Sequence, residues 1–149
     1  MKKELEKHFT ASALIINNGR VLLVNHKKFG VWLYPGGHVE KNETPDQAVI
    51  REVKEETGLD VEILGEKDNT LADDRVSVLY NPYAVLCEPI GKNHYHNDLI
   101  YLCKVSGKKR KIKYDKDESD GIKFFSLEEL DRIKLFPNFR SLLEKVLKN

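Results

Sequence analysis

The hydrophobic positions near the start of the chain form two short apolar-rich runs, as strands do. Apolar residues dominate 10–16 and 20–25, and the Asn18-Gly19 pair lies between these two segments. Asn-Gly favours a tight hairpin turn because both residues accept a positive φ, so we expect two antiparallel strands here. A further short strand is expected at 31–34, where it leads into Gly36 and Gly37.

The pattern changes to a helical period between Thr44 and Gly58. Thr44 is suited to cap a helix and Pro45 to occupy its first position, while Gly58 accepts the left-handed conformation that follows a last turn. The expected apolar edge of this helix consists of Val49, Ile50 and Val53. The segment is therefore predicted to be one amphipathic helix.

The rest of the chain repeats both kinds of segment. Four further strands are expected, at 60–65, 76–88, 98–105 and 121–125, with a loop at 89–97. Ser126 and Glu129 have the spacing of a capping box, which predicts the start of a helix. A final amphipathic helix is predicted from the spacing of Phe139, Leu142, Leu143, Val146 and Leu147. Strands and helices therefore interleave, which favours an α/β fold in one domain over residues 1–149.

Composition narrows the class of protein. The chain has 149 residues, of which 40% are hydrophobic and 33% charged, and its formal net charge is +1. Such a balance is typical of a globular protein and gives no reason to expect bulk affinity for nucleic acid or membranes. The charged N-terminus lacks the apolar core of a signal peptide, which predicts a cytoplasmic protein. The two cysteines, Cys87 and Cys103, are expected to be reduced and mostly buried thiols.

Three glutamates on the first predicted helix are the strongest candidates for chemistry. At about 100° per residue, Glu52, Glu55 and Glu56 share one stripe with Ala48, whereas Arg51 points away from that stripe. Like charges at this spacing disfavour the helix, and a divalent cation removes that penalty. A set of oxygen ligands suits Mg²⁺ or Mn²⁺ better than zinc. The alternative is an acidic helix face that is only solvated.

A longer pattern surrounds these glutamates. Its specified positions are filled here by Gly37, Glu43, Arg51, Glu52, Val53, Glu55, Glu56, Gly58 and Leu59. This stretch of 23 residues resembles the Nudix box of the Nudix hydrolases at every specified position. The resemblance implies a Nudix-type α/β/α sandwich with a mixed β-sheet. It also implies a loop–helix–loop site that binds divalent metal and a pyrophosphate.

The resemblance implies roles for five charged residues of the box. Glu52 and Glu56 are implied to be direct metal ligands, with Glu55 joining a second metal or ordering a water molecule. The arginine at Arg51 is implied to pair with Glu43 and to brace the loop against the helix. All five are therefore candidate catalytic residues, the last two through support of the others.

Two further metal contacts lie outside the box. By resemblance, the Gly36 carbonyl group adds an oxygen ligand from the approach to the helix. Nudix hydrolases often take another carboxylate from a loop well downstream, and Glu118 is our choice for it, with Asp120 second. A solvated acidic loop is the alternative for these two residues.

The segment His94-Tyr95-His96 is the most chemically varied stretch outside the box. Alternation into the following strand places His94, His96 and Asp98 on one side. We assign His94, Tyr95 and His96 to substrate contact. A solvated loop and a zinc site are the alternatives, although a zinc site here lacks a third soft ligand nearby.

The activity that the resemblance implies is metal-dependent hydrolysis of a pyrophosphate bond in a nucleoside diphosphate linked to another moiety. Nucleoside triphosphates, nucleotide sugars and dinucleotides all fit that description. Two alternatives are a catalytically weak Nudix-like module that senses nucleotides, and an RNA 5′-end pyrophosphohydrolase. The expected partner is a small nucleotide, with no stable nucleic-acid partner and no membrane, and a homodimer is possible on base rates.

Overall fold

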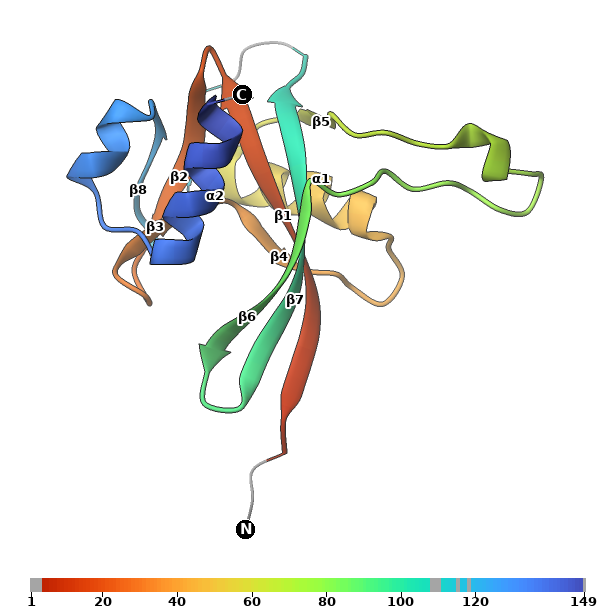
Figure 1. The fold of residues 1–149 in the computed structure, drawn as a ribbon, viewed down its shortest axis with the longest axis horizontal. Coiled ribbons are helices and arrows are strands. Elements are labelled where there is room, and N and C mark those ends of the chain that lie inside the picture. The colour runs from red at the N-terminus through yellow and green to blue at the C-terminus, as the bar shows by residue number, and fades with distance from the viewer. Residues whose placement is uncertain (1–3, 108–110, 115, 118, 149) are drawn as a thin grey trace.

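The described part of the chain forms a mixed sheet with helices against both faces (Figure 1). The computed structural model describes residues 4–107, 111–114, 116–117 and 119–148. Its strands are β1 (Glu6–Asn17), β2 (Arg20–His26), β3 (Val31–Leu33), β4 (Gly36–His38), β5 (Val61–Ile63), β6 (Ala84–Gly91), β7 (His94–Val105) and β8 (Ser119–Phe125). Its helices are α1 (Pro45–Thr57), α2 (Pro137–Lys148) and the short 3₁₀ helices η1 (Asn69–Leu71) and η2 (Glu128–Arg132). The predicted α/β fold with a mixed sheet is confirmed.

Strand β1 is the centre of this sheet. The main strand order is β3-β2-β1-β7-β5, with β4 beside β1, β6 beside β7 and β8 beside β2. β1 and β7 run parallel over the pairs from Glu6 and His94 to Ile15 and Cys103. At one end β1, β6 and β7 project together beyond the other strands (Figure 1). We call this projection, residues 6–9, 88–91 and 94–97, the arm.

Alternate residues of β1 face the two helices on opposite sides of the sheet. Ala11, Ala13 and Ile15 are fully buried in the cluster that also contains Val49 and Val53 of α1. Their neighbour Leu14 is buried in the other cluster, which contains Phe139, Leu143 and Val146 of α2. Because successive strand residues point to opposite faces, α1 and α2 cover different faces.

The predictions from short sequence motifs are confirmed at the first hairpin and near the last helix. Asn18 and Gly19 have φ values of 52° and 74°, as the hairpin prediction requires. At η2, Ser126 and Glu129 form the reciprocal capping box, with hydrogen bonds of 3.1 and 3.3 Å between them. The capping box begins a 3₁₀ helix of five residues, and the predicted amphipathic helix follows it as α2.

The β6–β7 hairpin corrects two predictions. The strand expected from residue 76 begins at Ala84, and the expected loop at 89–97 is strand except for a two-residue turn at Lys92 and Asn93, where Asn93 has a φ of 59°. The polar start of β7 is stabilised as a strand because it pairs with β1 on one side and β6 on the other. Residues 76–83 lie outside the described strands, although the Tyr83 N–H donates to the Ile100 carbonyl group of β7 at 2.7 Å.

The two cysteines differ in exposure. Cys103 is fully buried in β7, and burial raises the pKa of its thiol to about 12. Cys87 is exposed, so the expectation that it is buried is wrong. β6 alternates half-buried and exposed residues, and Cys87 falls in the exposed set. Both thiols are free.

Among the described residues, neither α1 nor α2 has the length and apolar content needed to cross a membrane.

Candidate functional site

Helix α1 is fixed at both ends by local hydrogen bonds. The Gln47 backbone N–H donates to the Thr44 hydroxyl oxygen at 3.2 Å, and the Thr44 backbone N–H donates to the Gln47 side chain at 2.9 Å. At the other end Gly58 has a φ of 77° and donates its N–H to the Lys54 carbonyl group at 2.9 Å. The predicted helix boundaries are therefore confirmed, and they fix which side chains face the sheet.

The buried face of α1 differs from the predicted one by one position. Val49 and Val53 are buried as expected, together with Ala48 and Thr57. Ile50 is 42% exposed, so its assignment to the apolar edge is wrong. Residues 49, 53 and 57 are spaced by four, and this spacing rather than Ile50 determines the contact with the sheet.

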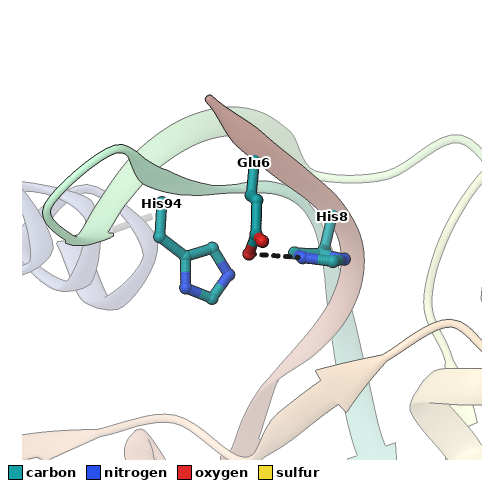
Figure 2. A group of neighbouring side chains, drawn as sticks. All are labelled: Glu6, His8 and His94. Carbon is teal, nitrogen blue, oxygen red and sulfur yellow. Dashed lines mark ion pairs between the residues drawn. The ribbon is translucent and has the colours of Figure 1, made fainter. Parts of the chain in front are cut away.

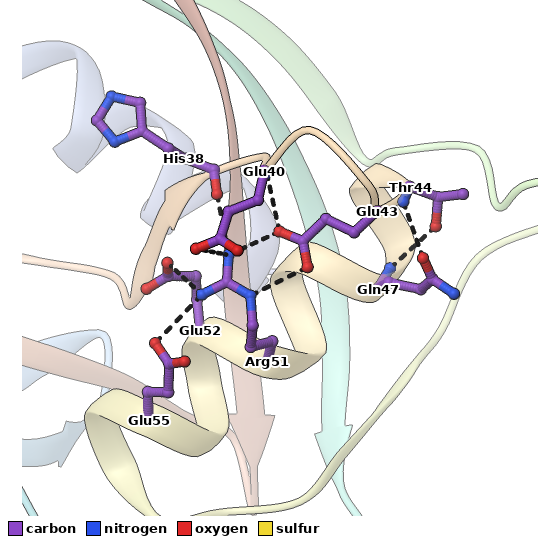
Figure 3. A network of polar contacts seen from close by, with 8 residues as sticks. All are labelled: His38, Glu40, Glu43, Thr44, Gln47, Arg51, Glu52 and Glu55. Atoms are coloured by element: carbon purple, nitrogen blue, oxygen red, sulfur yellow. Dashed lines mark hydrogen bonds and ion pairs between the residues drawn. The ribbon is translucent and has the colours of Figure 1, made fainter.

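Arg51 gathers the acidic residues around one guanidinium group (Figure 3). Its Nε and Nη2 donate to the two carboxylate oxygens of Glu43 at 3.0 and 2.6 Å. Its Nη1 donates to Glu52 at 2.9 Å and to Glu55 at 3.2 Å. Nη2 also donates to the His38 carbonyl group at 3.1 Å. One cation thus links the loop before α1, the helix and strand β4.

This network partly revises what the sequence predicts for Arg51. The contact with Glu43 is present, and the hydrogen bonds from Arg51 hold the pKa of Glu43 below its usual value. The expectation that Arg51 points away from the carboxylates is wrong, since it contacts Glu52 and Glu55. The arginine side chain is long enough to reach back across the helix surface to the stripe.

Gly36 and Gly37 bring the backbone of β4 against the carboxylates of α1. A Cβ atom on Gly37 would lie 2.5 Å from the carboxylate carbon of Glu52, so only glycine fits there without displacing that group. The Gly36 N–H donates to Glu56 at 3.3 Å. Backbone of β4 and the acidic face of α1 therefore form one surface, on which the predicted ligands Gly36, Glu52 and Glu56 lie close together.

A pocket opens beside Glu56. It is lined by Val24, His26, Leu33, Tyr34, Gly36, Glu56 and Ser119. Ser119 begins β8, so the pocket extends to the region where the downstream carboxylate is predicted. Glu118 lies outside the described residues. Asp120, the second choice, is exposed and pairs with Lys27 at 3.6 Å.

On the α2 face of the sheet, Asp98 is the centre of a polar network that the sequence analysis missed. Asp98 is only 3% exposed. One of its oxygens accepts from the hydroxyls of Thr10 at 2.9 Å and Ser12 at 2.8 Å. The other accepts from the Tyr34 hydroxyl, which also lies 3.2 Å from Glu88. Two polar residues spaced by two in the buried part of β1, residues 10–15, were the available signal, because core-facing hydroxyls need partners.

Burial and the neighbouring Asp98 raise the pKa of Glu88 to about 8. Glu88 is therefore largely protonated at neutral pH. The carboxyl groups of Glu88 and Asp98 both lie beside the Tyr34 hydroxyl. Because Tyr34 also lines the pocket beside Glu56, this network adjoins the candidate site.

The raised pKa of Glu88 predicts a specific loss of stability with pH. Between about 4.5, its ordinary value, and about 8, the folded protein binds a proton that the unfolded chain does not. Its contribution is fully present below that window and is lost as the pH rises through it. Glu88→Gln keeps a donor without a titrating group, so we expect its urea midpoint to fall less with pH than the wild-type midpoint.

The matched control for Glu88→Gln is Glu66→Gln, at an exposed loop glutamate. This variant should keep the wild-type slope of unfolding midpoint against pH. Equal slopes in Glu88→Gln and the wild type would show that Glu88 does not hold the proton. Because the measurement needs neither substrate nor metal, it is made in the presence of a chelator.

The predicted substrate-contact residues lie at the start of β7, in the arm. His94 and His96 project from one face, with ring centroids 5.2 Å apart. His8 of β1 lies 5.0 Å from His94, and His38 of β4 lies 5.0 Å from His96. Tyr95 alternates to the other face, where Lys7 approaches its ring at 6.0 Å. Substrate contact by these three residues stays a prediction.

Comparisons with known proteins match one family over most of the chain. The model of the NUDIX domain matches residues 6–146. A solved structure of a NUDIX family hydrolase from Clostridium perfringens is similar, with 32% identity, a TM-score of 0.83, and 97% of this chain and 98% of that chain covered.

Curated relatives match over shorter stretches. An 8-oxo-dGTP diphosphatase from Proteus vulgaris is 59% identical over 32 residues, which cover 22% of this chain and 29% of that protein. An RNA pyrophosphohydrolase from Hydrogenovibrio crunogenus is 46% identical over 56 residues, covering 36% of this chain and 34% of that protein. The matched stretch thus spans about a third of the length of these relatives.

Proposed function

Since the chain belongs to the Nudix family, we propose that it is a metal-dependent hydrolase of a pyrophosphate bond in a nucleoside diphosphate linked to another moiety. The observation that carries this proposal is the set of Glu52, Glu55 and Glu56 on α1, of which Glu52 lies against Gly37 and Glu56 accepts a hydrogen bond from the Gly36 N–H. A solvated acidic face would not need a glycine at position 37 to admit the Glu52 carboxylate. The pocket that Gly36 and Glu56 help to line opens next to this group.

The residues present fit a divalent cation. The three carboxylates and the Gly36 carbonyl group offer oxygen atoms only, which is the ligand chemistry that Mg²⁺ and Mn²⁺ prefer. Three carboxylates, those of Glu43, Glu52 and Glu55, share the guanidinium of Arg51, and the Glu56 carboxylate lies beside Gly36. The crowding of these carboxylates favours an additional cation. We assign Glu52, Glu55, Glu56 and Gly36 to hold it.

The chain's own residues hold the metal ligands in position and do not themselves attack the substrate. A divalent cation, when bound, neutralises phosphate oxygens and activates water for attack on phosphorus. Arg51 holds Glu52 and Glu55 in fixed positions and ties them to Glu43 and the His38 carbonyl group. Gly37 has no side chain, so the β4 backbone and Glu52 stay in contact. Attack by water would break the bridging P–O bond and release two phosphate-bearing products.

Two substrate classes follow from the relatives. The Proteus vulgaris relative is named for a modified nucleoside triphosphate, which supports small nucleotides as the first candidate. The Hydrogenovibrio crunogenus relative is named an RNA pyrophosphohydrolase, which favours a 5′-triphosphorylated RNA end as the second. Both share the chemistry at α1. The net charge of +1 supports the small nucleotide, since RNA binding usually involves a basic surface.

A substrate panel tests the proposal. Nucleoside triphosphates including 8-oxo-dGTP, nucleotide sugars, dinucleotides and 5′-triphosphorylated RNA would be incubated with Mg²⁺ or Mn²⁺, and the products separated by chromatography. We expect at least one small nucleotide to be cleaved at a pyrophosphate bond, with no product when a chelator is added. RNA should compete weakly with that nucleotide.

Three results would contradict the proposal in different ways. Tight nucleotide binding with no product from any substrate, over long incubation with metal, would favour a nucleotide-sensing module. Preferential cleavage of triphosphorylated RNA would favour the second candidate instead. Products that form equally fast with chelator present would remove the metal from the proposal.

A further inference from the structure

We propose that the arm carries a second metal site, for Zn²⁺ or a similar transition metal, with Glu6, His8 and His94 as its protein ligands. This site is distinct from the carboxylates of α1 and is not needed for the function proposed above. It belongs to the histidine cluster, which we define as His8, His38, His94 and His96. These are four of the five histidines in the chain.

Sheet register brings the cluster together from three strands. In the parallel pair of β1 and β7, Glu6 lies opposite His94 and His8 lies opposite His96. His38 of β4 lies opposite Thr10, two residues further along β1 than His8. Because alternate strand residues share a face, all of these side chains project from the same side of the arm. The further imidazole ligand that the sequence alone did not indicate for His94 is therefore His8.

Glu6, His8 and His94 have the geometry of a site that a cation would close. One ligand atom from each lies within 4.8 Å of the other two. Glu6 and His8 already form an ion pair at 3.6 Å, and His94 lies on the other side of the same carboxylate (Figure 2). In a tetrahedral zinc site with bonds of about 2.1 Å, ligand atoms are about 3.4 Å apart. Small side-chain rotations would close the remaining difference.

Unpaired nitrogen atoms give an independent reason to expect a ligand. The Nε2 atoms of His94 and His96 are buried and have no hydrogen-bond partner among the described residues. Buried polar atoms are nearly always paired, because an unpaired one costs free energy on folding. A cation at His94 would satisfy its Nε2. Imidazole rings at 5.0 to 5.4 Å from one another also surround the site with further nitrogen donors.

The donor set selects a different metal from that of α1. Imidazole nitrogens with one carboxylate suit zinc and similar transition metals, whereas the oxygen donors on α1 suit Mg²⁺ or Mn²⁺. Three protein ligands leave a fourth position open for water or a small anion. The bound metal would join the start of β1 to the start of β7. It would thus staple the projecting strands to each other.

Calorimetric titration with Zn²⁺ tests this site. The protein is first freed of bound transition metal, and the buffer contains excess Mg²⁺ to occupy the carboxylates of α1. We expect one zinc ion per chain. His8→Gln and His94→Gln should each weaken zinc binding at least about tenfold, because even loss of an outer-shell partner has that effect. Co²⁺ in place of zinc should give the visible absorption of a tetrahedral site in the wild type but not in these variants.

Two matched controls separate this site from the rest of the protein. His26→Gln, which removes the remaining histidine, should leave zinc affinity unchanged. Glu56→Gln should also leave zinc affinity unchanged. The zinc measurement therefore tests the arm site separately from the hydrolysis of nucleotides. Urea unfolding without metal establishes that each variant folds. Absence of zinc binding would overturn the proposal, as would binding that survives both His8→Gln and His94→Gln.

Discussion

Replacing Glu56 with glutamine should lower kcat at least about a thousandfold while leaving the fold intact. Metal-assisted charge stabilisation is worth several kcal/mol, and each 1.36 kcal/mol is about tenfold in rate. Glutamine has the shape of glutamate and retains an oxygen that accepts from the Gly36 N–H, which lies 3.3 Å from Glu56. It lacks the negative charge that a cation requires. The measurement is kcat with saturating Mg²⁺ on the best substrate of the panel.

The control for Glu56→Gln is Glu62→Gln, at the exposed position of β5, where Glu62 pairs with Lys104 at 3.6 Å. An exposed pair of this kind contributes little, so activity and unfolding midpoint should stay at wild-type values. Urea unfolding of Glu56→Gln in the presence of chelator should also match the wild type. Full turnover by Glu56→Gln with Mg²⁺ present would remove the basis of the proposed function.

Replacing Arg51 with methionine should lower kcat about 10- to 100-fold and raise the Mg²⁺ concentration needed for half-maximal rate. Residues that position metal ligands typically have effects of this size. Without the guanidinium, Glu43, Glu52 and Glu55 lose their common partner and repel one another. The unfolding midpoint without metal should fall, and Mg²⁺ should restore part of it. Mg²⁺-dependent kinetics and urea unfolding measure these effects.

Arg51→Lys distinguishes positioning from charge alone. A lysine keeps the positive charge but has no planar fork, so it cannot bind Glu43 through two parallel hydrogen bonds while reaching Glu52. We expect it to recover stability more than kcat. If Arg51→Met changes stability and leaves the Mg²⁺ dependence untouched, then Arg51 supports only the fold. If both lysine and methionine variants are fully active, the network has no part in the reaction.

The parts of the site that follow from local sequence were predictable. Thr44, Gln47 and Gly58 satisfy the ends of α1 within a few residues, so the helix and its acidic stripe follow from spacing alone. The Asn18-Gly19 turn is likewise determined by two adjacent residues. In each case the hydrogen-bond partners are close in sequence. Tertiary packing therefore has little opportunity to override the local preference.

The predictions that were wrong or missing concern residues whose partners are distant in sequence. Nothing near residue 94 indicates that a polar strand will be paired on both sides, and so 89–97 was expected to be a loop. Asp98 finds Thr10 at a separation of 88 residues, and the register that joins them is not encoded in either segment alone. The same register assembles the histidine cluster. The predicted direction of Arg51 was wrong for a different reason. The ideal helix angle fixes the position of its Cα atom but not that of the end of its flexible side chain.

The parallel pairing of β1 with β7 has a consequence for how the protein is made. As the chain leaves the ribosome, the first hairpin and α1 form early, while one edge of β1 waits for a strand much later in the sequence. During that interval the nascent chain displays an open strand edge to its neighbours, the situation that most favours aggregation. Closing so long a loop is also slow. Translation speed and chaperone supply are thus expected to govern the yield of this protein more than its final stability does.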